Sequence, residues 1–371
     1  MPFPTSAGRR WLLIVLLLAA AIGAWQLSRA PQPKPATARS TPAATGPTPT
    51  DGRLRGVSWV AGDSVSSLDL EPLVRARVTW IAQTPFGWQA GAAVPEIRLQ
   101  TGKGSRHYWG ESDAGIVQTA KRARQRGIST LLKPHLWLRG GSGSWPGDVN
   151  MTSAADWQQW FASYSSFILH YARLAEEHQL EALCIGTELQ HASVGHEQEW
   201  RTLIRQIRGV YHGQLTYAAN WSGEFEQVPF WDALDFIGIQ AYFPLSKTER
   251  PEKAALLRAW QEPLRRIKAI QRRFKKPVAF TEIGYKTTPD AAIEPWAWPD
   301  RMAVLTTVDE ATQTACYAAM FETFWPQRWF RGLFVWKWYP GLTPDRATRR
   351  HLDFTPQHKP AEQVMTDWFG R

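Results

Sequence analysis

Two glutamates each follow a short apolar run, and this placement suggests acid–base chemistry. Glu188 ends the segment 182–188, and Glu282 ends the segment 278–282. A carboxylate at the end of an apolar strand is costly to bury without a polar partner or a ligand. An ion pair is the structural alternative. Two carboxyl groups that face one cleft suit acetal hydrolysis, in which one protonates the leaving oxygen and the other attacks the anomeric carbon or activates water.

The separation of the two carboxyl groups decides the stereochemical outcome of such a reaction. A retaining enzyme holds them about 5–5.5 Å apart, and an inverting enzyme about 6.5–9.5 Å apart. Spacing along the chain does not fix this distance. The residues by themselves therefore leave both outcomes open.

The elements that must position the glutamates alternate between short apolar strands and helices. Apolar residues recur at helical spacing in the segments between the strands, as in 157–171. Eight such units in a row predict a (β/α)8 TIM barrel over residues 54–371, with the active site at the carboxyl ends of the strands. An open doubly wound sheet is the alternative, but no Gly-rich phosphate turn follows the first strand. The predicted strands are 56–60, 78–83, 130–136, 182–188, 215–220, 236–242, 278–282 and 333–338.

Other strand ends supply candidates for substrate binding. Lys133, His135 and Trp137 share one face of the third strand because side chains alternate along a strand. Lys133 is expected to face the barrel mouth and pair with a carboxylate. His135 either donates hydrogen bonds to sugar hydroxyls or has a structural role. Asn220 and Trp221 end the fifth strand.

The loops contain one further candidate and one acidic residue without an expected role in chemistry. Trp145 lies after the third strand, in the sequence Ser-Gly-Ser-Trp-Pro-Gly. A tryptophan ring is flat and carries a polar N–H, so it suits stacking on a sugar ring as well as core packing. Because binding residues are common on loops, Trp145 is interpreted as a stacking platform. Glu224, in contrast, is interpreted as a helix cap or a rim residue.

These segments together resemble glycoside hydrolase family 113, the β-mannanase-like barrels of clan A. The resemblance runs in order over most of residues 55–369. It implies that Glu188 is the acid/base and Glu282 the nucleophile, with net retention and a mannan-like substrate. The matching segments are Leu-Lys-Pro-His-Leu-Trp (132–137), Cys-Ile-Gly-Thr-Glu-Leu (184–189), Ala-Asn-Trp (219–221), Phe-Ile-Gly-Ile-Gln-Ala-Tyr-Phe-Pro (236–244), Phe-Thr-Glu-Ile-Gly-Tyr (280–285) and Val-Trp-Lys-Trp-Tyr-Pro (335–340).

The same resemblance implies roles for four more residues. A tyrosine at the position of Tyr242 hydrogen-bonds the nucleophile in similar enzymes. Trp336 and Trp338 are expected to form a floor under the sugar. Thr187 stands where many clan A enzymes carry an asparagine that contacts the sugar 2-hydroxyl group.

Composition narrows the possible partners. The net charge is +10, which is compatible with nucleic acid, anionic membranes or acidic glycans. The basic runs read as solvated helix faces, so no nucleic acid partner is expected. Cys184 and Cys316 are the two cysteines, too few for a disulfide framework. No clustered His/Cys spacing is present, and neither a metal nor another cofactor is predicted.

The N-terminal region indicates the cellular compartment. Arg9 and Arg10 precede an uncharged apolar run, 11–27, which is typical of a signal anchor or a cleaved signal peptide. The anchor is preferred because no small-x-small cleavage site ends the run. Residues 1–10 would then be a cytoplasmic tail, 11–27 a transmembrane helix, and 28–53 a linker rich in Pro, Thr and Ala.

These observations lead to one main hypothesis and one alternative. The main hypothesis is a single-pass membrane protein whose exported barrel, periplasmic or extracellular, cleaves a β-linked polysaccharide or oligosaccharide. The alternative is a catalytically idle barrel that binds glycans during the assembly of envelope polysaccharide. The presence of both Glu188 and Glu282 favours the enzyme.

Overall fold

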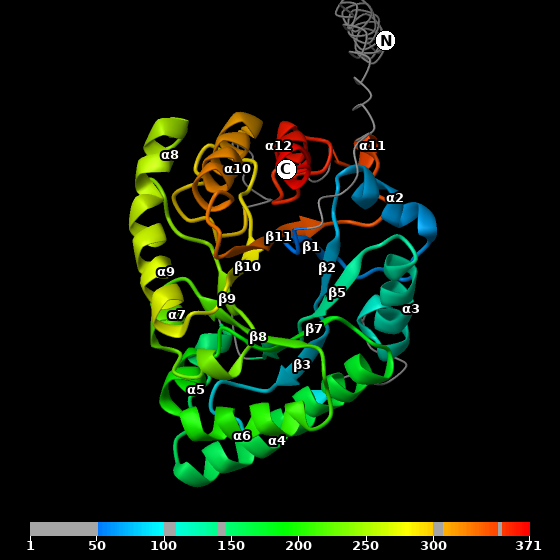
Figure 1. The fold of residues 1–371 in the computed structure, drawn as a ribbon, viewed down its shortest axis with the longest axis vertical. Helices are drawn as coiled ribbons and strands as arrows, with labels where there is room; N and C mark the ends of the chain where they lie inside the picture. Colours follow the sequence, from blue (N-terminus) through cyan, green and yellow to red (C-terminus); the bar gives the residue numbers. More distant parts are fainter. Residues whose placement is uncertain (1–50, 100–108, 140–144, 300–306, 348–350) are drawn as a thin grey trace, which may run out of the picture. The chain divides into compact units, whose positions relative to one another are not determined.

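Eight parallel strands close into a barrel in the computed structural model, which confirms the predicted fold (Figure 1). The structure describes residues 51–99, 109–139, 145–299, 307–347 and 351–371, all within the unit Ala44–Arg371. The order around the barrel is β1-β11-β10-β9-β8-β7-β5-β2. The strands are β1 (Leu54–Trp59), β2 (Trp80–Gln83), β5 (Ser129–Leu132), β7 (Ala182–Thr187), β8 (Gln214–Asn220), β9 (Ile237–Gln240), β10 (Val278–Ile283) and β11 (Phe330–Trp338).

Helices surround the barrel (Figure 1). The longest helix of the described residues, α4, begins after Ser153, whose hydroxyl accepts a hydrogen bond from the Asp156 amide, and it buries an aromatic face. The α-helices are α2 (Ser67–Arg75), α3 (Asp113–Arg124), α4 (Ala154–Glu177), α5 (Gln190–Gly195), α6 (Glu197–Arg208), α7 (Glu224–Gln227), α8 (Lys253–Ala259), α9 (Gln261–Phe274), α10 (Glu310–Phe324), α11 (Pro344–Ala347) and α12 (Pro360–Phe369). The described residues also form the 3-10 turns η1 (Trp109–Glu111), η2 (Pro146–Asp148) and η3 (Trp231–Ala233).

The predicted third strand, 130–136, is divided in the structure. It forms β5 in the barrel and then β6 (His135–Leu138), which belongs to a separate sheet of order β4-β3-β6. Pro134 stands at the division, where a proline cannot donate a ladder hydrogen bond. The other two strands of this small sheet, β3 (Phe86–Gln89) and β4 (Ile97–Leu99), were not predicted.

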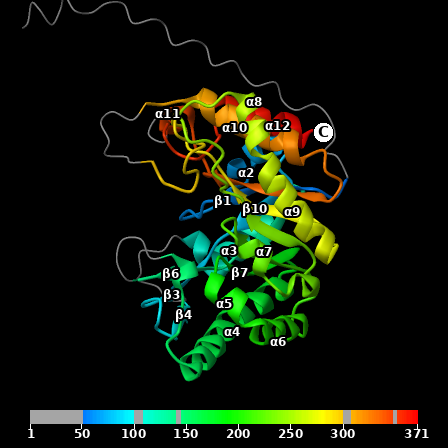
Figure 2. The same ribbon diagram turned by 90° about the vertical axis from the view of Figure 1, so that its left-hand side faces the viewer.

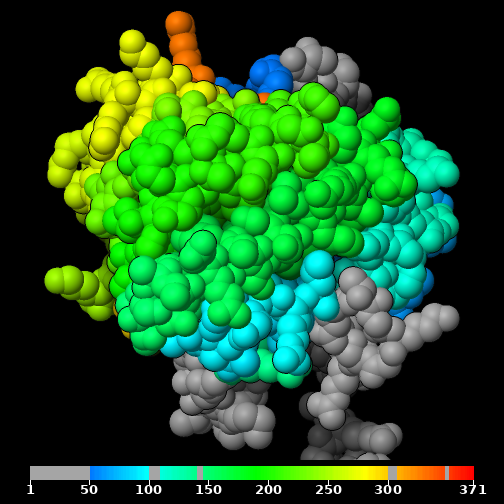
Figure 3. Space-filling model, turned by 90° about the horizontal axis from the view of Figure 1, so that it is seen from below, coloured from blue at the N-terminus to red at the C-terminus, as the bar shows by residue number. Residues whose placement is uncertain are grey.

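The small sheet lies beside the barrel and against helix α4. Figure 2 shows β3, β4 and β6 together at one side of the barrel. In Figure 3 the cyan chain of this region borders the green helices at the surface. Gly87 of β3 packs so closely on α4 that an added Cβ would lie 2.6 Å from the Phe167 ring. The sheet is therefore fixed to the barrel's helical layer on one face.

Two apolar clusters form the core. The larger lies between the strands and the helices. The smaller joins strand residues and Phe236, which directly precedes β9, and it fills the barrel interior. Phe334 packs so tightly there that a Cβ on Gly56 would approach it to 2.3 Å. Cys184 belongs to β7 and Cys316 to α10, and both are free, buried thiols.

A buried arginine joins the start of the barrel to its C-terminal helix. Arg55 lies near the beginning of β1, and its guanidinium donates to the carbonyls of Phe369 and Arg371 at 2.7 and 2.9 Å. It also donates to the Asp51 carboxylate at 2.6 Å. Because a barrel's mouth lies at the carboxyl ends of its strands, this contact lies at the opposite end.

The predicted cytoplasmic tail (1–10), the apolar run (11–27) and residues 28–50 of the linker lie outside the described residues. The last linker residues, 51–53, are described and contact the barrel, since Arg53 donates to the Trp325 carbonyl at 2.5 Å. In the part of the chain that the structure describes, no helix combines the length and apolar character needed to cross a membrane.

Candidate active site

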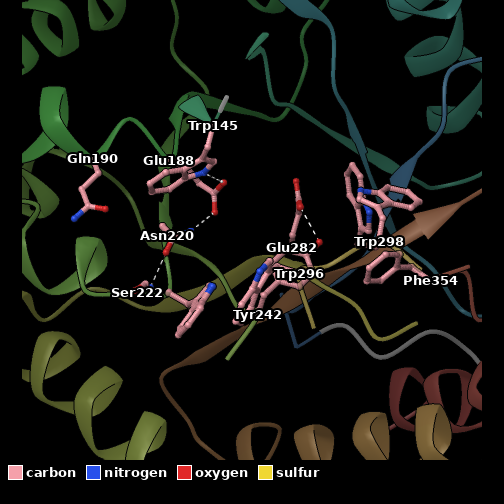
Figure 4. Close-up of a pocket in the computed structure, with 12 residues that line it drawn as sticks. Trp145, Glu188, Gln190, Asn220, Ser222, Tyr242, Glu282, Trp296, Trp298 and Phe354 are labelled. Atoms are coloured by element: carbon pink, nitrogen blue, oxygen red, sulfur yellow. Dashed lines mark hydrogen bonds between the residues drawn. The ribbon is translucent and has the colours of Figure 1, made fainter. Parts of the chain in front are cut away.

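A cavity of about 550 Å³ opens at the carboxyl ends of the barrel strands (Figure 4). Glu188 and Glu282 both line it. Glu188 directly follows β7, and Glu282 lies in β10. The other lining residues are mostly aromatic or amide side chains: Trp145, Gln190, Asn220, Trp221, Ser222, Tyr242, Trp296, Trp298, Trp336 and Phe354.

Glu282 is held by direct polar contacts that include Lys133 and Tyr242. The Lys133 ammonium, fully buried beyond the end of β5, pairs with Oε1 of Glu282. The Tyr242 hydroxyl donates to Oε2 at 2.9 Å. His135 stands nearby, with Nε2 3.8 Å from Oε1. Lys133 therefore pairs with a carboxylate, as its place on the strand predicted.

The surroundings of Glu282 favour its ionised form. Burial by itself would raise the pKa of Glu282, but the positive charge of Lys133 and the hydrogen bonds outweigh it and lower the pKa below its ordinary value. Burial and the charge of Lys133 lower the pKa of His135 to about 3, so its imidazole is neutral at physiological pH. Glu282 is therefore a carboxylate over a wide pH range.

Glu188 has two neutral hydrogen-bond donors in place of a cation. The Trp145 indole N–H donates to Oε2 at 2.8 Å, and the Asn220 amide donates to Oε1 at 2.6 Å. Burial raises the pKa of Glu188 to about 7, and the charge of Glu282 adds to the rise while the two hydrogen bonds oppose it. Near neutral pH, Glu188 can therefore give up or take a proton.

A third glutamate, Glu224, hydrogen-bonds residues that surround Glu188. Glu224, the first residue of α7, accepts hydrogen bonds from the Ser193 hydroxyl at 2.6 Å, the Tyr217 hydroxyl at 2.5 Å and the Asn220 amide N–H at 2.6 Å. Glu224 is fully buried, so its interpretation as a helix cap or rim residue was wrong. Burial raises the pKa of Glu224 to about 7.

The hydrogen bonds of Glu224 lead to Glu188 by two routes. Asn220, whose backbone Glu224 binds, donates its side-chain amide to Glu188. Tyr217, which donates to Glu224, accepts a hydrogen bond from the Leu189 amide at 2.7 Å, next to Glu188 in the chain. Glu188 itself has a positive φ of 54°, a backbone conformation that most residues avoid. Glu224 is thus placed to fix both the side chain and the backbone around Glu188.

Most of the predicted site residues meet at this cavity. Trp336 lines it, with the Lys133 ammonium 6.0 Å from its ring centroid. Trp221 stacks on Trp296 at a centroid distance of 5.0 Å. The predicted residues that line the cavity or contact its glutamates are Glu188, Glu282, Lys133, His135, Trp145, Asn220, Trp221, Tyr242 and Trp336.

Three predicted residues lie elsewhere. Trp338 is 1% exposed and belongs to the core, so it does not form a floor with Trp336. The reason is a bulge: Val57 and Trp59 pair with Val335 and Trp338, which adds one residue to β11 and breaks the alternation. Thr187 is buried and does not line the cavity. Trp137 is exposed on β6, outside the cavity lining.

Several lining residues were not predicted. Trp296 and Trp298 lie in the loop that follows β10, and Phe354 precedes α12. The sequence Glu-Pro-Trp-Ala-Trp-Pro, 294–299, is a signal for the two tryptophans, since paired aromatics in a loop after a barrel strand suit ligand contact. Phe354 has no comparable signal.

The described residues form no cluster of metal ligands. In residues 51–99, 109–139, 145–299, 307–347 and 351–371, no three His, Cys, Asp or Glu side chains gather as a metal site would require. The side chains that line the cavity offer acid–base chemistry. They comprise one ionised carboxylate, one carboxyl group that titrates near neutral pH, and an aromatic wall.

The parallel barrel and the carboxyl pair at its mouth define a (β/α)8-barrel glycoside hydrolase. Comparison with family models gives the particular family. The model of Glycoside Hydrolase Family 113 matches residues 56–359, and the chain belongs to that family. A search of curated proteins finds no match.

Solved structures agree with this assignment. A family 113 β-mannanase from Alicyclobacillus acidocaldarius, in complex with ManMIm, has a TM-score of 0.72 and 27% identity over 86% of this chain and 97% of that chain. A family 113 β-1,4-mannanase has a TM-score of 0.70 and 26% identity over 85% and 98%. A β-glucuronidase from Ruminococcus gnavus shares the fold, with a TM-score of 0.54 and 14% identity over 85% and 50%.

Proposed function

We propose that this glycoside hydrolase acts with retention, Glu188 serving as acid/base and Glu282 as nucleophile. The observation that carries the proposal is the contrast between the two carboxyl groups in one cavity. The pKa of Glu282 is lowered by Lys133, whereas burial raises the pKa of Glu188 to about 7. The acid needs a carboxyl group whose pKa is raised so that it keeps its proton. The nucleophile needs one whose pKa is lowered so that it stays ionised.

The reaction would proceed in two displacements. Glu282 attacks the anomeric carbon while Glu188 donates its proton to the glycosidic oxygen, so the leaving sugar departs as an alcohol and a glycosyl ester forms on Glu282. Glu188, now a carboxylate, takes a proton from water. The resulting hydroxide attacks the anomeric carbon and releases Glu282. Retention follows from the two inversions, and it requires the carboxyl groups to be about 5–5.5 Å apart.

The substrate we propose is a β-linked, mannan-like polysaccharide or oligosaccharide. The support comes from the solved family 113 structures, which are described as β-mannanases. The aromatic lining of the cavity, including Trp145, Trp221, Trp296 and Trp336, suits the flat apolar faces of pyranose rings. No organic cofactor or metal enters the proposed reaction.

A glycan panel tests this function. Purified protein is incubated with β-1,4-linked mannan, glucan and xylan oligosaccharides, and the initial anomer of the product is followed by NMR. We expect cleavage with the β anomer released first, and loss of turnover by several orders of magnitude in Glu282→Gln. Lys286→Met is the matched control, because Lys286 is a buried lysine paired with Asp290 outside the cavity. Release of the α anomer first would contradict retention.

The same panel addresses the alternative of a glycan-binding barrel. Such a protein would bind one of the oligosaccharides with equal affinity before and after Glu282→Gln, and neither form would hydrolyse it. The buried Lys133–Glu282 pair argues against this alternative, since a buried charge pair with no catalytic use is expensive to maintain. Nucleic acid is not a partner in this proposal.

We also propose that the barrel is exported and held at the membrane. Residues 11–27 form the anchor, 1–10 the cytoplasmic tail, 28–53 the tether and 54–371 the catalytic domain. The support is the uncharged apolar run behind Arg9 and Arg10. Cell fractionation of the full chain tests it: we expect the protein in the membrane fraction with an intact N-terminus. A soluble protein with an intact N-terminus would contradict the anchor, and a soluble protein cleaved after residue 27 would indicate a signal peptide.

A further inference from the structure

An aromatic row runs across the small sheet beside the cavity. In the parallel pair β3–β6, Phe86 is opposite His135 and Trp88 is opposite Trp137. The centroid distance is 5.7 Å from Phe86 to His135 and 5.9 Å from Phe86 to Trp137. Trp88 and Trp137 are also 5.9 Å apart. We call Phe86, Trp88 and Trp137 the β3–β6 platform.

The opposite face of the same two strands is buried against helix α4. Gln89 accepts a hydrogen bond from the Trp160 indole at 3.0 Å, and Gly87 lies against Phe167. Leu136 and Leu138 of β6 are buried as well. Because side chains alternate along a strand, the platform faces away from α4. Packing on the helical layer therefore does not account for the platform's aromatic character.

The platform is continuous with the cavity at its inner end. His135, which borders Phe86, has Nε2 3.8 Å from the Glu282 carboxylate and a side chain only 15% exposed. Trp137, further out, is 53% exposed. The Arg139 guanidinium lies 4.9 Å from the Trp88 ring centroid. The row therefore leads from the buried carboxylate to solvent and carries hydrogen-bond donors at its outer end.

We propose that the β3–β6 platform binds sugar units of the β-linked glycan that are remote from the bond being cleaved. The inference rests on the proposed function, because its occupant is the continuation of the chain bound at Glu282. Exposed tryptophan on a rigid strand gives a flat apolar surface at low entropic cost, which suits stacking on pyranose rings. Arg139 would donate to sugar hydroxyls at the edge of the platform.

The proposal predicts that the platform increases kcat/KM for long substrates relative to short ones. The values of kcat/KM are determined for an aryl monoglycoside and for β-1,4-mannohexaose with wild type, Trp137→Ala and Trp137→Phe. We expect Trp137→Ala to reduce the ratio of hexaose to monoglycoside kcat/KM about tenfold. Trp137→Phe should restore most of the ratio, because a flat ring remains. Leu68→Ala, at an exposed position on α2, is the matched control and should keep the wild-type ratio.

An unchanged ratio in Trp137→Ala would overturn the platform while leaving the proposed hydrolase intact. If the wild type cleaves no glycan, the proposed function fails. The role of the platform is then tested separately, by measuring glycan binding. In that case calorimetry compares mannohexaose binding by Glu282→Gln with binding by Glu282→Gln/Trp137→Ala. Binding at least about fivefold weaker in the double variant supports the platform. Equal binding, or no binding by either protein, overturns it.

Discussion

The ammonium group of Lys133 meets the carboxylate of Glu282 inside the barrel mouth, although the two residues are 149 positions apart in the chain. Both side chains are buried, so neither charge is compensated by solvent. Removing one partner of such a pair typically costs about 3–5 kcal/mol, whereas replacing both by apolar groups costs much less. The pair therefore links the stability of the fold to the ionisation of its central carboxylate.

This coupling predicts the outcome of a double-mutant cycle. Glu282→Ala leaves Lys133 buried without its partner and should lower the free energy of unfolding by about 3–5 kcal/mol. Lys133→Met/Glu282→Ala should be more stable than Glu282→Ala alone. Denaturant unfolding at pH 7 measures both changes. Additive costs in the double variant would contradict the ion pair.

The pH dependence of kcat/KM should reflect the two carboxyl groups. Glu282 must be ionised, and its pKa is lowered, so the acidic limb should lie below the ordinary range of glutamate. Glu188 must be protonated, so activity should fall as the pH rises through about 7. The indole N–H of Trp145 stabilises the ionised Glu188, and Trp145→Phe should therefore move the alkaline limb to higher pH. Trp221→Phe is the control, and a shift of equal size in that variant would refute the specific role of the Trp145 bond.

The leaving group should determine how much the loss of Glu188 matters. Glu188→Ala is expected to slow hydrolysis of natural glycans by about 10²–10⁴-fold, the usual contribution of a general acid. Activated aryl glycosides need less protonation and should lose far less in the glycosylation step. Pre-steady-state kinetics on a series of aryl mannosides measure this difference. Equal losses across the series would assign Glu188 another role.

Glu224 should behave as a positioning residue that acts through Asn220. Glu224→Gln replaces one of the two acceptor oxygens by an amide N–H. That N–H then faces a group that already donates, either the Asn220 backbone N–H or the Ser193 and Tyr217 hydroxyls. We expect kcat to fall about tenfold with little change in KM, since the misplaced acid affects the transition state. The loss should be larger for poor leaving groups than for activated aryl glycosides. A purely structural residue would reduce both equally.

The barrel could be predicted from the sequence because each buried strand is a short apolar run between amphipathic helices. Glu188, Glu282 and Lys133 were found for the same reason, since a charge at the end of an apolar strand needs a partner. Side-chain alternation predicted that Lys133 and His135 share one face of the strand, with Lys133 paired to a carboxylate. The same rule failed for Trp338, where the bulge in β11 adds a residue.

The remaining site residues depend on tertiary packing. Trp296, Trp298 and Phe354 come from long connections whose paths are set by distant contacts. Glu224 was misinterpreted because it lies near a strand end, where a cap or rim role is the default, and only the positions of Tyr217 and Ser193 make it a buried acceptor. The platform residues Phe86 and Trp88 were missed because β3 lies outside the eight-fold repeat.

Arg55 bears on how this enzyme can be handled in the laboratory. Its guanidinium ties the entry of β1 to the carbonyls of Phe369 and Arg371, at the end of the barrel away from Glu188 and Glu282. Figure 2 shows the C-terminus on the side opposite the small sheet. A fusion partner or a solid support joined after Arg371 would thus leave the opening clear for a polymer. A chain shortened to end before Phe369 would instead leave a buried cation without two of its acceptors.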